Sequence, residues 1–255
     1  MSLGARGAFW RRLAPCLVES WPSELTRLAG AQTLVPLSRP EMHDLLAAVR
    51  GTGAGAPVPR IAAASGGPSE RLRALRLRLD AAISGANGHA FVRLGAASAK
   101  DGWRHQRTEG CARSGRDALE ILTWGSRRIE QMLRLCLHAG HETTIVLRPF
   151  RPPPRSEYRL FVADGTLLGA CQIGPPPAPP DPIVLARALR DSAGRIAAAV
   201  RAPSVADVFV EPGPKVTLFD VNPFSPRTDA APFRWSGGGG GDFDGSIRLS
   251  DGSRI

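Results

Sequence analysis

Two turn signals in the C-terminal half of the chain limit its fold more than any other feature. Asp164-Gly165 separates the apolar segments EYRLFVA and TLLGACQ, and Pro212-Gly213 separates VADVFVE and KVTLFDV. Asp-Gly between alternating apolar residues is a strong hairpin signal, since both residues accept the positive φ of a tight turn. We therefore expect antiparallel sheets rather than a doubly wound parallel sheet.

Helical segments are interleaved with these and other strands. Residues 1–30, EMHDLLAAVR, ERLRALRLRLDAAISG, RDALEILTWGSRRIEQMLRLCLHAG and IVLARALRDSAGRIAAAVR are predicted as helices. The segments QTLVPLSRP, HAFVRLG and HETTIVLRPF are predicted as further strands. GTGAGAPVPRIAAASGGPS is expected to be a linker, and the glycine-rich tail from residue 236 is expected to be mobile. The expected fold class is α+β.

The positive charge of the chain does not point to nucleic acid. The 33 basic and 23 acidic residues give a formal net charge of 33 − 23 = +10. Every basic residue except Lys100 and Lys215 is an arginine, which is typical of a GC-rich genome. The arginines form no long basic block and are not interleaved with aromatic residues, so we do not expect nucleic acid as a partner.

The chain also has no feature of a membrane or disulfide-bonded protein. No apolar stretch is long enough to span a bilayer, so no membrane is expected as a partner. Cys16, Cys111, Cys136 and Cys171 have no C-x-x-C spacing. They fit reduced thiols, and we expect a cytoplasmic protein.

The second hairpin brings together side chains that could hold a metal ion. In an extended FDVNPF segment, Asp220 and Asn222 point to one face and Phe219 and Val221 to the other. If the turn is the four residues 212–215, Asp207 lies opposite Asp220 with Cβ atoms about 5 Å apart. Carboxylates that close repel each other, and a cation such as Mg²⁺ would reverse this effect. A one-residue slip would separate the aspartates and leave ordinary solvent-facing side chains, so both interpretations stay open.

Magnesium held by few protein ligands implies a phosphate partner, and basic residues near other strands could meet it. They are Arg93, Lys100, Arg148 and Arg159. Arginine offers a planar fork that matches phosphate oxygens. Arg159 alternates with Tyr158 and Leu160, so it shares a face with Glu157. Each of these cations could equally be a solvated surface charge.

Taken together, the motifs resemble the cell division cycle protein 123 family, which is related to ATP-grasp proteins. The segments that carry the resemblance are WPSELTRLAGAQTLVPLSRPEMHDLL, FVRLGAASAKDG, IVLRPF, EYRLFVADGTLLGACQ, DVFV and FDVNPFSPRTDAAPFRW. The resemblance implies an ATP-grasp-like fold with two lobes, antiparallel sheets and a nucleotide cleft between the lobes. It places an N-terminal region and smaller lobe over residues 1–145, a C-terminal lobe over 146–235, and a flexible tail over 236–255.

The resemblance also implies ATP and Mg²⁺ as cofactors and assigns residues to them. Asp207, Asp220 and Asn222 match the family's metal ligands. Arg93 falls where eukaryotic members often have a phosphate-binding lysine, and Lys100 lies in the loop after it. Leu147 and Arg148 match the hinge expected to touch adenine, and Glu157, Arg159 and Gln172 match positions lining the nucleotide.

Three functions are compatible with such a site. In eukaryotes the family acts as an assembly chaperone that binds the gamma subunit of translation initiation factor 2, so we expect this partner if the chain is eukaryotic. If the chain is bacterial, an ATP-dependent carboxylate-amine ligase that forms an acyl phosphate is the leading alternative. A third possibility is a nucleotide-gated binding module without turnover. Whether the chain is an enzyme is left open.

Overall fold

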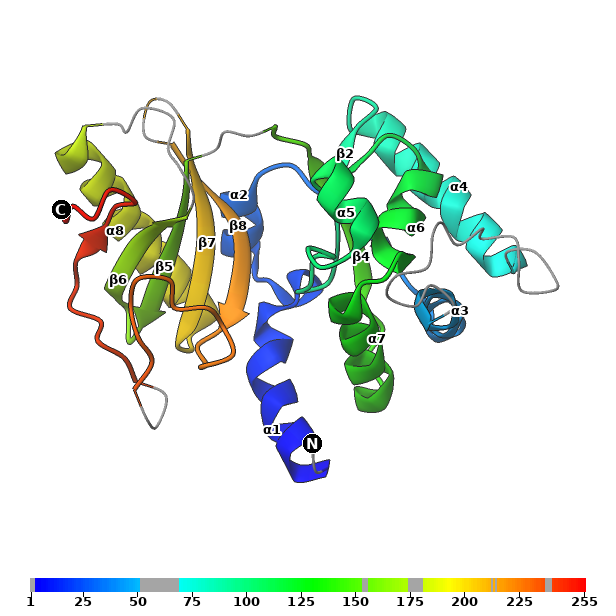
Figure 1. Ribbon diagram of the computed structural model, residues 1–255, viewed down its shortest axis with the longest axis horizontal. Helices are drawn as coiled ribbons and strands as arrows, with labels where there is room; N and C mark the ends of the chain where they lie inside the picture. The colour runs from blue at the N-terminus through cyan, green and yellow to red at the C-terminus, as the bar shows by residue number, and fades with distance from the viewer. Residues whose placement is uncertain are drawn as a thin grey trace. The chain divides into compact units, whose positions relative to one another are not determined.

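The structure, a computed structural model, describes residues 3–50, 69–152, 156–173, 181–211, 213, 215–236 and 240–255. The chain forms two compact units, one from Met1–Trp10 and Ala31–Arg151 and one from Arg11–Gly30 and Pro152–Ile255. Each unit contains its own sheet, and α-helices pack on it (Figure 1). The expected α+β fold class is confirmed. Of the expected linker GTGAGAPVPRIAAASGGPS, only Ser69 lies within the described residues.

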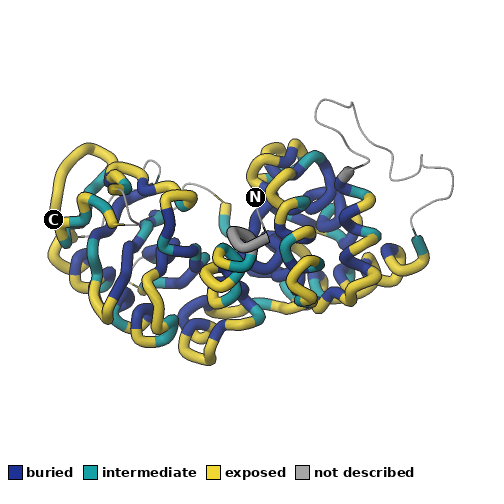
Figure 2. Tube along the Cα trace, turned by 90° about the horizontal axis from the view of Figure 1, so that it is seen from below, coloured by how far each residue is buried: buried dark blue, intermediate teal, exposed yellow. Residues whose placement is uncertain are grey.

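The first unit is built on a four-stranded sheet in which every neighbouring pair is antiparallel. The strand order is β1 (Thr33–Pro36), β4 (Thr144–Pro149), β2 (Ala90–Leu94) and β3 (Cys111–Ala112). Strand β2 is buried throughout and β4 at all but its last residue, whereas β1 at the edge is mostly exposed. Figure 2 shows the burial of each described residue along the chain. This core is what the apolar segments HAFVRLG and HETTIVLRPF predicted.

Helices complete the first unit, and the sequence marks where they begin and end. They are α1 (Leu3–Leu13), which starts in this unit, α3 (Arg39–Arg50), α4 (Glu70–Gly85), α5 (Trp103–Thr108), α6 (Gly115–Thr123) and α7 (Arg127–Ala139). Helices α4, α6 and α7 follow Ser69, Ser114 and Ser126, whose side chains each accept a backbone N–H three residues on. Gly140, with φ of 68°, ends α7.

The second unit is built on a five-stranded sheet. The strand order is β8 (Lys215–Pro223), β7 (Ser204–Glu211), β5 (Glu157–Ala163), β6 (Thr166–Ile173) and β9 (Ile247–Arg248). All neighbouring pairs are antiparallel except β6 and β9, which are parallel. Two 3-10 turns, η1 (Ala14–Cys16) and η2 (Val18–Ser20), and helix α2 (Ser23–Ala29) come from the N-terminal part of the chain, and α2 packs against β8 and α8.

The hairpin of β5 and β6 turns at Asp164-Gly165, as the sequence predicted. Ala163 pairs with Thr166, so the turn has two residues, with φ of 47° at Asp164 and 77° at Gly165. Positive φ at both central positions is the type I′ geometry that matches the twist of the strands. Past the turn, one extra residue in β6, Leu168, forms a bulge opposite the step from Phe161 to Val162.

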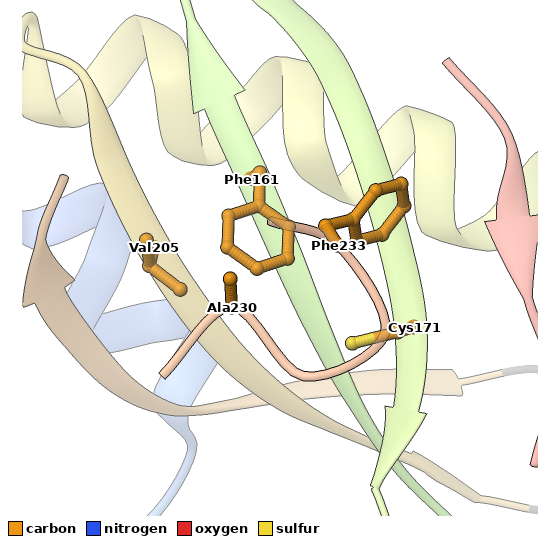
Figure 3. Close-up of a cluster of buried hydrophobic side chains, with 5 residues drawn as sticks. All are labelled: Phe161, Cys171, Val205, Ala230 and Phe233. Atoms are coloured by element: carbon orange, nitrogen blue, oxygen red, sulfur yellow. The ribbon is translucent and has the colours of Figure 1, made fainter. Parts of the chain in front are cut away.

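Helix α8 (Pro182–Val200) covers one face of this sheet. It begins at Asp181, whose carboxylate accepts the backbone N–H groups of Ile183 and Val184 at 2.9 and 3.1 Å. Its buried residues include Leu185, Leu189 and Ile196, and it packs on strands β5 to β8. A segment after β8 covers the opposite face, so the sheet lies between this segment and α8 (Figure 3).

The described part of the expected tail is ordered on the sheet. Residues 240–255 belong to the second unit, and their strand β9 adds to the outer edge of β6. Ile247 is fully buried, and its backbone exchanges hydrogen bonds of 3.0 and 3.1 Å with that of Ile255. The apolar side chains of Phe243 and Ile247 account for the packing of this glycine-rich segment on the sheet.

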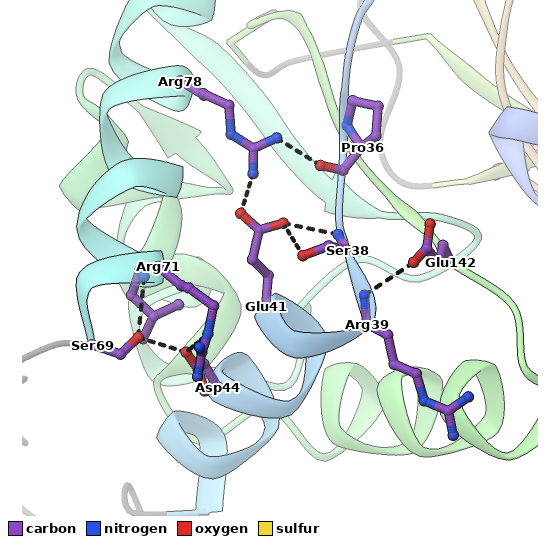
Figure 4. Close-up of polar contacts among 10 residues, drawn as sticks. Pro36, Ser38, Arg39, Glu41, Asp44, Ser69, Arg71, Arg78 and Glu142 are labelled. Atoms are coloured by element: carbon purple, nitrogen blue, oxygen red, sulfur yellow. Dashed lines mark hydrogen bonds and ion pairs between the residues drawn. The ribbon is translucent and has the colours of Figure 1, made fainter.

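A polar network joins α3 and α4 in the first unit (Figure 4). Glu41 accepts hydrogen bonds of 2.8 Å from the backbone N–H and hydroxyl of Ser38 and pairs with Arg78 of α4. Asp44 accepts a hydrogen bond of 2.9 Å from Arg71. Arg71 and Arg78 of α4 are therefore paired with carboxylates inside the first unit.

Two further expectations concern the whole chain. The described residues contain no helix with the length and apolar character that a bilayer crossing requires. None of the four cysteines, all of which lie within the described residues, is part of a disulfide bond.

Candidate functional site

Strands β7 and β8 place Asp207 directly opposite Asp220. The expected pairing is confirmed, but the structure reaches it by a different route. Pairing begins at Glu211 and Lys215, so the turn is one residue shorter than expected. An extra residue in β8, Phe219, then forms a bulge that shifts the register by one. Without this bulge, Asp207 and Asp220 would lie on opposite faces of the sheet.

The side chains around Asp220 alternate as the sequence predicted. Asp220 and Asn222 are half-buried, whereas Val221 between them is fully buried. Asn222 lies opposite Val205, which in turn lies opposite Phe161 of β5. The oxygens of Asp207, Asp220 and Asn222 therefore share one face of the sheet, the face opposite α8.

Arg159 on β5 holds the carboxylate of Asp207 from the neighbouring strand. Its Nε donates to Oδ1 at 2.7 Å and its Nη2 donates to Oδ2 at 3.0 Å. Its Nη1 donates to the backbone oxygen of Asp229 at 2.7 Å and lies 3.8 Å from the carboxylate Oδ2 of the same residue. Only 12% of the Arg159 side chain and 4% of the Asp207 side chain are exposed.

The charge state of this pair is well defined. Burial alone lowers the pKa of Arg159, but the hydrogen bonds and negative charge of Asp207 outweigh it, and the net effect raises the pKa. The guanidinium is therefore always charged. On the other side of Arg159, Cys171 of β6 lies opposite it, and burial raises the pKa of this thiol to about 12. Cys171 is neutral at physiological pH and contributes no charge to the site.

Residues 224–236, which we call the covering segment, pack over the same face beyond Arg159. Phe233 of this segment lies edge-on to Phe161 with ring centroids 5.4 Å apart, and Ala230 packs beside it (Figure 3). The indole Nε1 of Trp235 donates to the backbone oxygen of Thr228 at 2.7 Å. These contacts fix the segment whose Asp229 carbonyl accepts from Arg159.

Glu157 and Gln172, two residues that the resemblance places beside the nucleotide, lie on opposite faces of the sheet. Glu157 is half-buried and is two residues from Arg159, so both are on the face of the aspartates. Gln172 lies opposite Tyr158 and so points to the α8 face, where its Oε1 accepts the backbone N–H of Ser250 at 3.2 Å. The bulge at Leu168 shifts β6 by one residue, and for this reason Gln172 lies on the other face of the sheet from Glu157 and Arg159.

The first unit holds the remaining candidate residues. Arg93 of β2 is fully buried, and its Nε donates to the backbone oxygen of Gly95 at 3.1 Å. Arg148 of β4 is 5% exposed and its Nε donates to Oε1 of Gln32 at 3.2 Å. Arg93 lies opposite Val146 and is therefore on the same face as Arg148. Neither arginine is the solvated surface charge of the simpler interpretation.

Leu147 and Lys100 differ from these arginines. Leu147 is 1% exposed and points to the other face of the sheet from Arg148, because neighbours along a strand alternate. Lys100 is exposed in the loop after β2. The next residue, Asp101, ties this loop to the start of α7 by accepting from the hydroxyl of Ser126 at 2.7 Å.

The site also includes a residue that sequence reasoning did not single out, Asp229. Its role depends on its backbone oxygen and on the way the covering segment folds back over β5, which no side-chain pattern signals. Asp229 and Asp207 thus bring two carboxylates to one guanidinium, and Asp220 lies opposite Asp207 on the next strand. The described residues contain no group of three or more His, Cys, Asp and Glu side chains placed to hold a metal ion. A metal site here would depend on Asn222 as a ligand.

The fold and site define an α+β protein of two units, whose second unit carries acidic and amide oxygens on one face of its sheet. Among solved structures, it is similar to Cdc123 from Schizosaccharomyces pombe, both as such and in C-terminally truncated form. Each of these two structures has a TM-score of 0.70 and 20% sequence identity over 94% of this chain and 96% of that chain. The expected resemblance is confirmed for the fold.

The other comparisons with known proteins found weaker similarity or none. A RimK domain ATP-grasp protein from Sphaerobacter thermophilus has a TM-score of 0.29 and 18% identity, over 63% of this chain and 64% of that chain. No family model matches the sequence. No curated protein matches it either.

Proposed function

We propose that the chain binds Mg·ATP and uses it, in the cytoplasm, to assist the assembly of a protein client. The observation that carries the proposal is the row of Arg159, Asp207 and Asp220 across three neighbouring strands, with Asn222 on the same face. The fold shared with Cdc123 supports the resemblance from which the nucleotide and the client were inferred.

The side chains present fit a magnesium ion. Two carboxylates and an amide supply the hard oxygen ligands that Mg²⁺ prefers, and the ion usually completes its shell with water and phosphate oxygens. Arg159 takes one hydrogen-bonding position on each oxygen of Asp207, and a carboxylate has about four such positions. Asp207 can thus accept from Arg159 and bind a metal at once. The ion would offset the repulsion between Asp207 and Asp220.

The other proposed nucleotide contacts differ in how well their positions support them. Glu157 and Arg159 lie on the face of the metal ligands, and Arg93 and Arg148 lie together on one face in the first unit. Lys100 is exposed and can reach a phosphate, whereas Leu147 is buried on the central strand β4, opposite Thr33 and Val92. Gln172 points to the α8 face, so its proposed contact with the nucleotide rests on the resemblance alone.

Calorimetry of Mg·ATP binding tests the nucleotide site. Asp220→Ala should abolish binding while leaving the circular dichroism spectrum unchanged, because Asp220 is half-buried at the edge strand of its sheet. Asp191→Ala is the matched control, since it removes an exposed carboxylate from α8, on the other face of the same sheet. Equal ATP affinity in both variants and the wild type would refute the assignment.

Product analysis then separates the client function from the ligase. If the chain is eukaryotic, we propose that the client is the gamma subunit of translation initiation factor 2, and the purified subunit should be captured only with Mg·ATP. Release of ADP on incubation with amino acids or peptides would instead establish the carboxylate-amine ligase. Capture without ATP dependence would contradict the proposed use of the nucleotide.

A further inference from the structure

The guanidinium of Arg159 bonds to protein atoms through each of its three nitrogens. Of its five N–H groups, one on each nitrogen is engaged: two on the carboxylate of Asp207 and one on the carbonyl of Asp229. The fork geometry that would match a phosphate matches Asp207 instead, at 2.7 and 3.0 Å. The charge of Arg159 is likewise balanced by the carboxylate it holds.

The side chain of Arg159 also joins two separate parts of the second unit. Its two partners come from different parts of the unit, Asp207 from the centre of β7 and Asp229 from the covering segment. One buried side chain thus sets the orientation of a proposed metal ligand and the position of the chain that follows Asn222.

We propose that Arg159 is a positioning residue for the metal site rather than a ligand of the nucleotide phosphates. It holds both oxygens of Asp207 in the plane that presents them to the ion, and it anchors the covering segment beside them. This inference rests on the proposed function, since it specifies how the Mg²⁺ ligand of that site is oriented. It assigns Arg159 a role different from the one that the resemblance implies.

Hydrogen bonds to a ligating carboxylate fix its orientation, and losing such a partner typically costs about 10- to 100-fold in metal affinity. Arg159→Lys keeps the positive charge but cannot make the two parallel bonds to Asp207. We therefore expect this variant to need about 10- to 100-fold more Mg²⁺ for half-maximal ATP binding. Its ATP affinity at saturating Mg²⁺ should equal that of the wild type.

The matched control is Arg248→Lys. Arg248 is 13% exposed, lies on β9 in the same row of the sheet, and holds the backbone oxygens of Pro232 and Asp242 rather than Asp207. Its substitution disturbs the covering segment to a similar extent, and the Mg²⁺ requirement should not change. Calorimetric titrations of Mg²⁺ at fixed ATP, and of ATP at saturating Mg²⁺, separate the two affinities.

Combining substitutions tests whether Arg159 acts through Asp207. Arg159→Lys should have no further effect on Mg²⁺ affinity in an Asp207→Asn background. A loss of ATP affinity that persists at saturating Mg²⁺, or in the Asp207→Asn background, would show a direct phosphate contact and overturn the inference while the proposed function stands. A wild-type protein that binds no Mg·ATP would refute both.

Discussion

The two proposed metal ligands should differ sharply in what they contribute to stability. Asp207→Ala leaves the guanidinium of Arg159 buried, with two of its hydrogen bonds lost. Asp220→Ala removes a half-buried carboxylate that faces a like charge. We expect the first substitution to destabilise the second unit strongly and the second to have little effect.

The magnitude follows from the geometry of the pair. Removing one partner of a buried ion pair costs about 3–5 kcal/mol. Because 12% of the Arg159 side chain remains exposed, the lower end of this range, about 3 kcal/mol, applies. At about 2–4 °C per kcal/mol for chains of this size, Asp207→Ala should lower Tm by about 6–12 °C. Asp220→Ala should change the free energy of unfolding by about 1 kcal/mol or less.

Differential scanning calorimetry in the presence of EDTA measures both variants without any contribution from a metal ion. The double variant Asp207→Leu with Arg159→Met provides the internal check, because replacing a buried pair by apolar residues removes the uncompensated charge. It should regain at least half of the stability lost by Asp207→Ala. Equal losses for the two aspartates, or a double variant no more stable than Asp207→Ala, would refute this reasoning.

Three further predictions concern other parts of the chain. Gly115→Ala should destabilise the first unit, because a Cβ there would lie 2.2 Å from the backbone oxygen of Arg76. Gly194→Ala, in open space on α8, should instead stabilise the chain by about 0.5–1 kcal/mol. Urea unfolding of both variants checks that the free energy of unfolding falls in the first and rises in the second. Hydrogen bonds from Ser246 lower the pKa of Asp244 to about 2. The stability that this carboxylate contributes should therefore be present above about pH 4 and be lost as the pH falls toward 2. Amide hydrogen exchange of residues 244–255 should become faster over this pH range, and Asp244→Asn should abolish the pH dependence. Cys111 is half-buried and the other three cysteines are buried, so iodoacetamide should label Cys111 first in the folded protein, as mass spectrometry of tryptic peptides would show.

The sequence allowed the hairpins to be found, but not their bulges. For the second hairpin, the expected turn was one residue too long and the bulge at Phe219 was not foreseen. These two errors cancel, so Asp207 still lies opposite Asp220. A bulge depends on how a strand packs against its neighbours and leaves no clear signal in the order of side chains.

In the first hairpin, a bulge separates two residues that a regular ladder would place opposite each other. An uninterrupted ladder from the Asp164-Gly165 turn would pair Glu157 with Gln172 and place both on one face. The bulge at Leu168 moves Gln172 opposite Tyr158 instead. Position along a strand is therefore readable from the sequence, whereas the face on which a side chain lies is reliable only up to the first bulge.

The fold class was predictable because it follows from local signals, namely turn residues, helix caps and apolar periodicity. The contacts that make Arg159 and Asp229 neighbours are not local, since they join residues 70 positions apart. The ordered strand β9 was missed for a related reason, since one buried isoleucine outweighs a glycine-rich composition only when an open sheet edge is available.

The division of the chain into units has a consequence for synthesis. Residues 11–30 belong to the second unit, and their helix α2 packs against α8 and β8. These residues leave the ribosome before most of the first unit, whereas their partners α8 and β8 are made only after it. The first unit can fold before residues 152–255 are made, whereas the second unit must wait for them. A fragment that begins at residue 152 lacks Leu25 and Leu28, which are buried in the second unit.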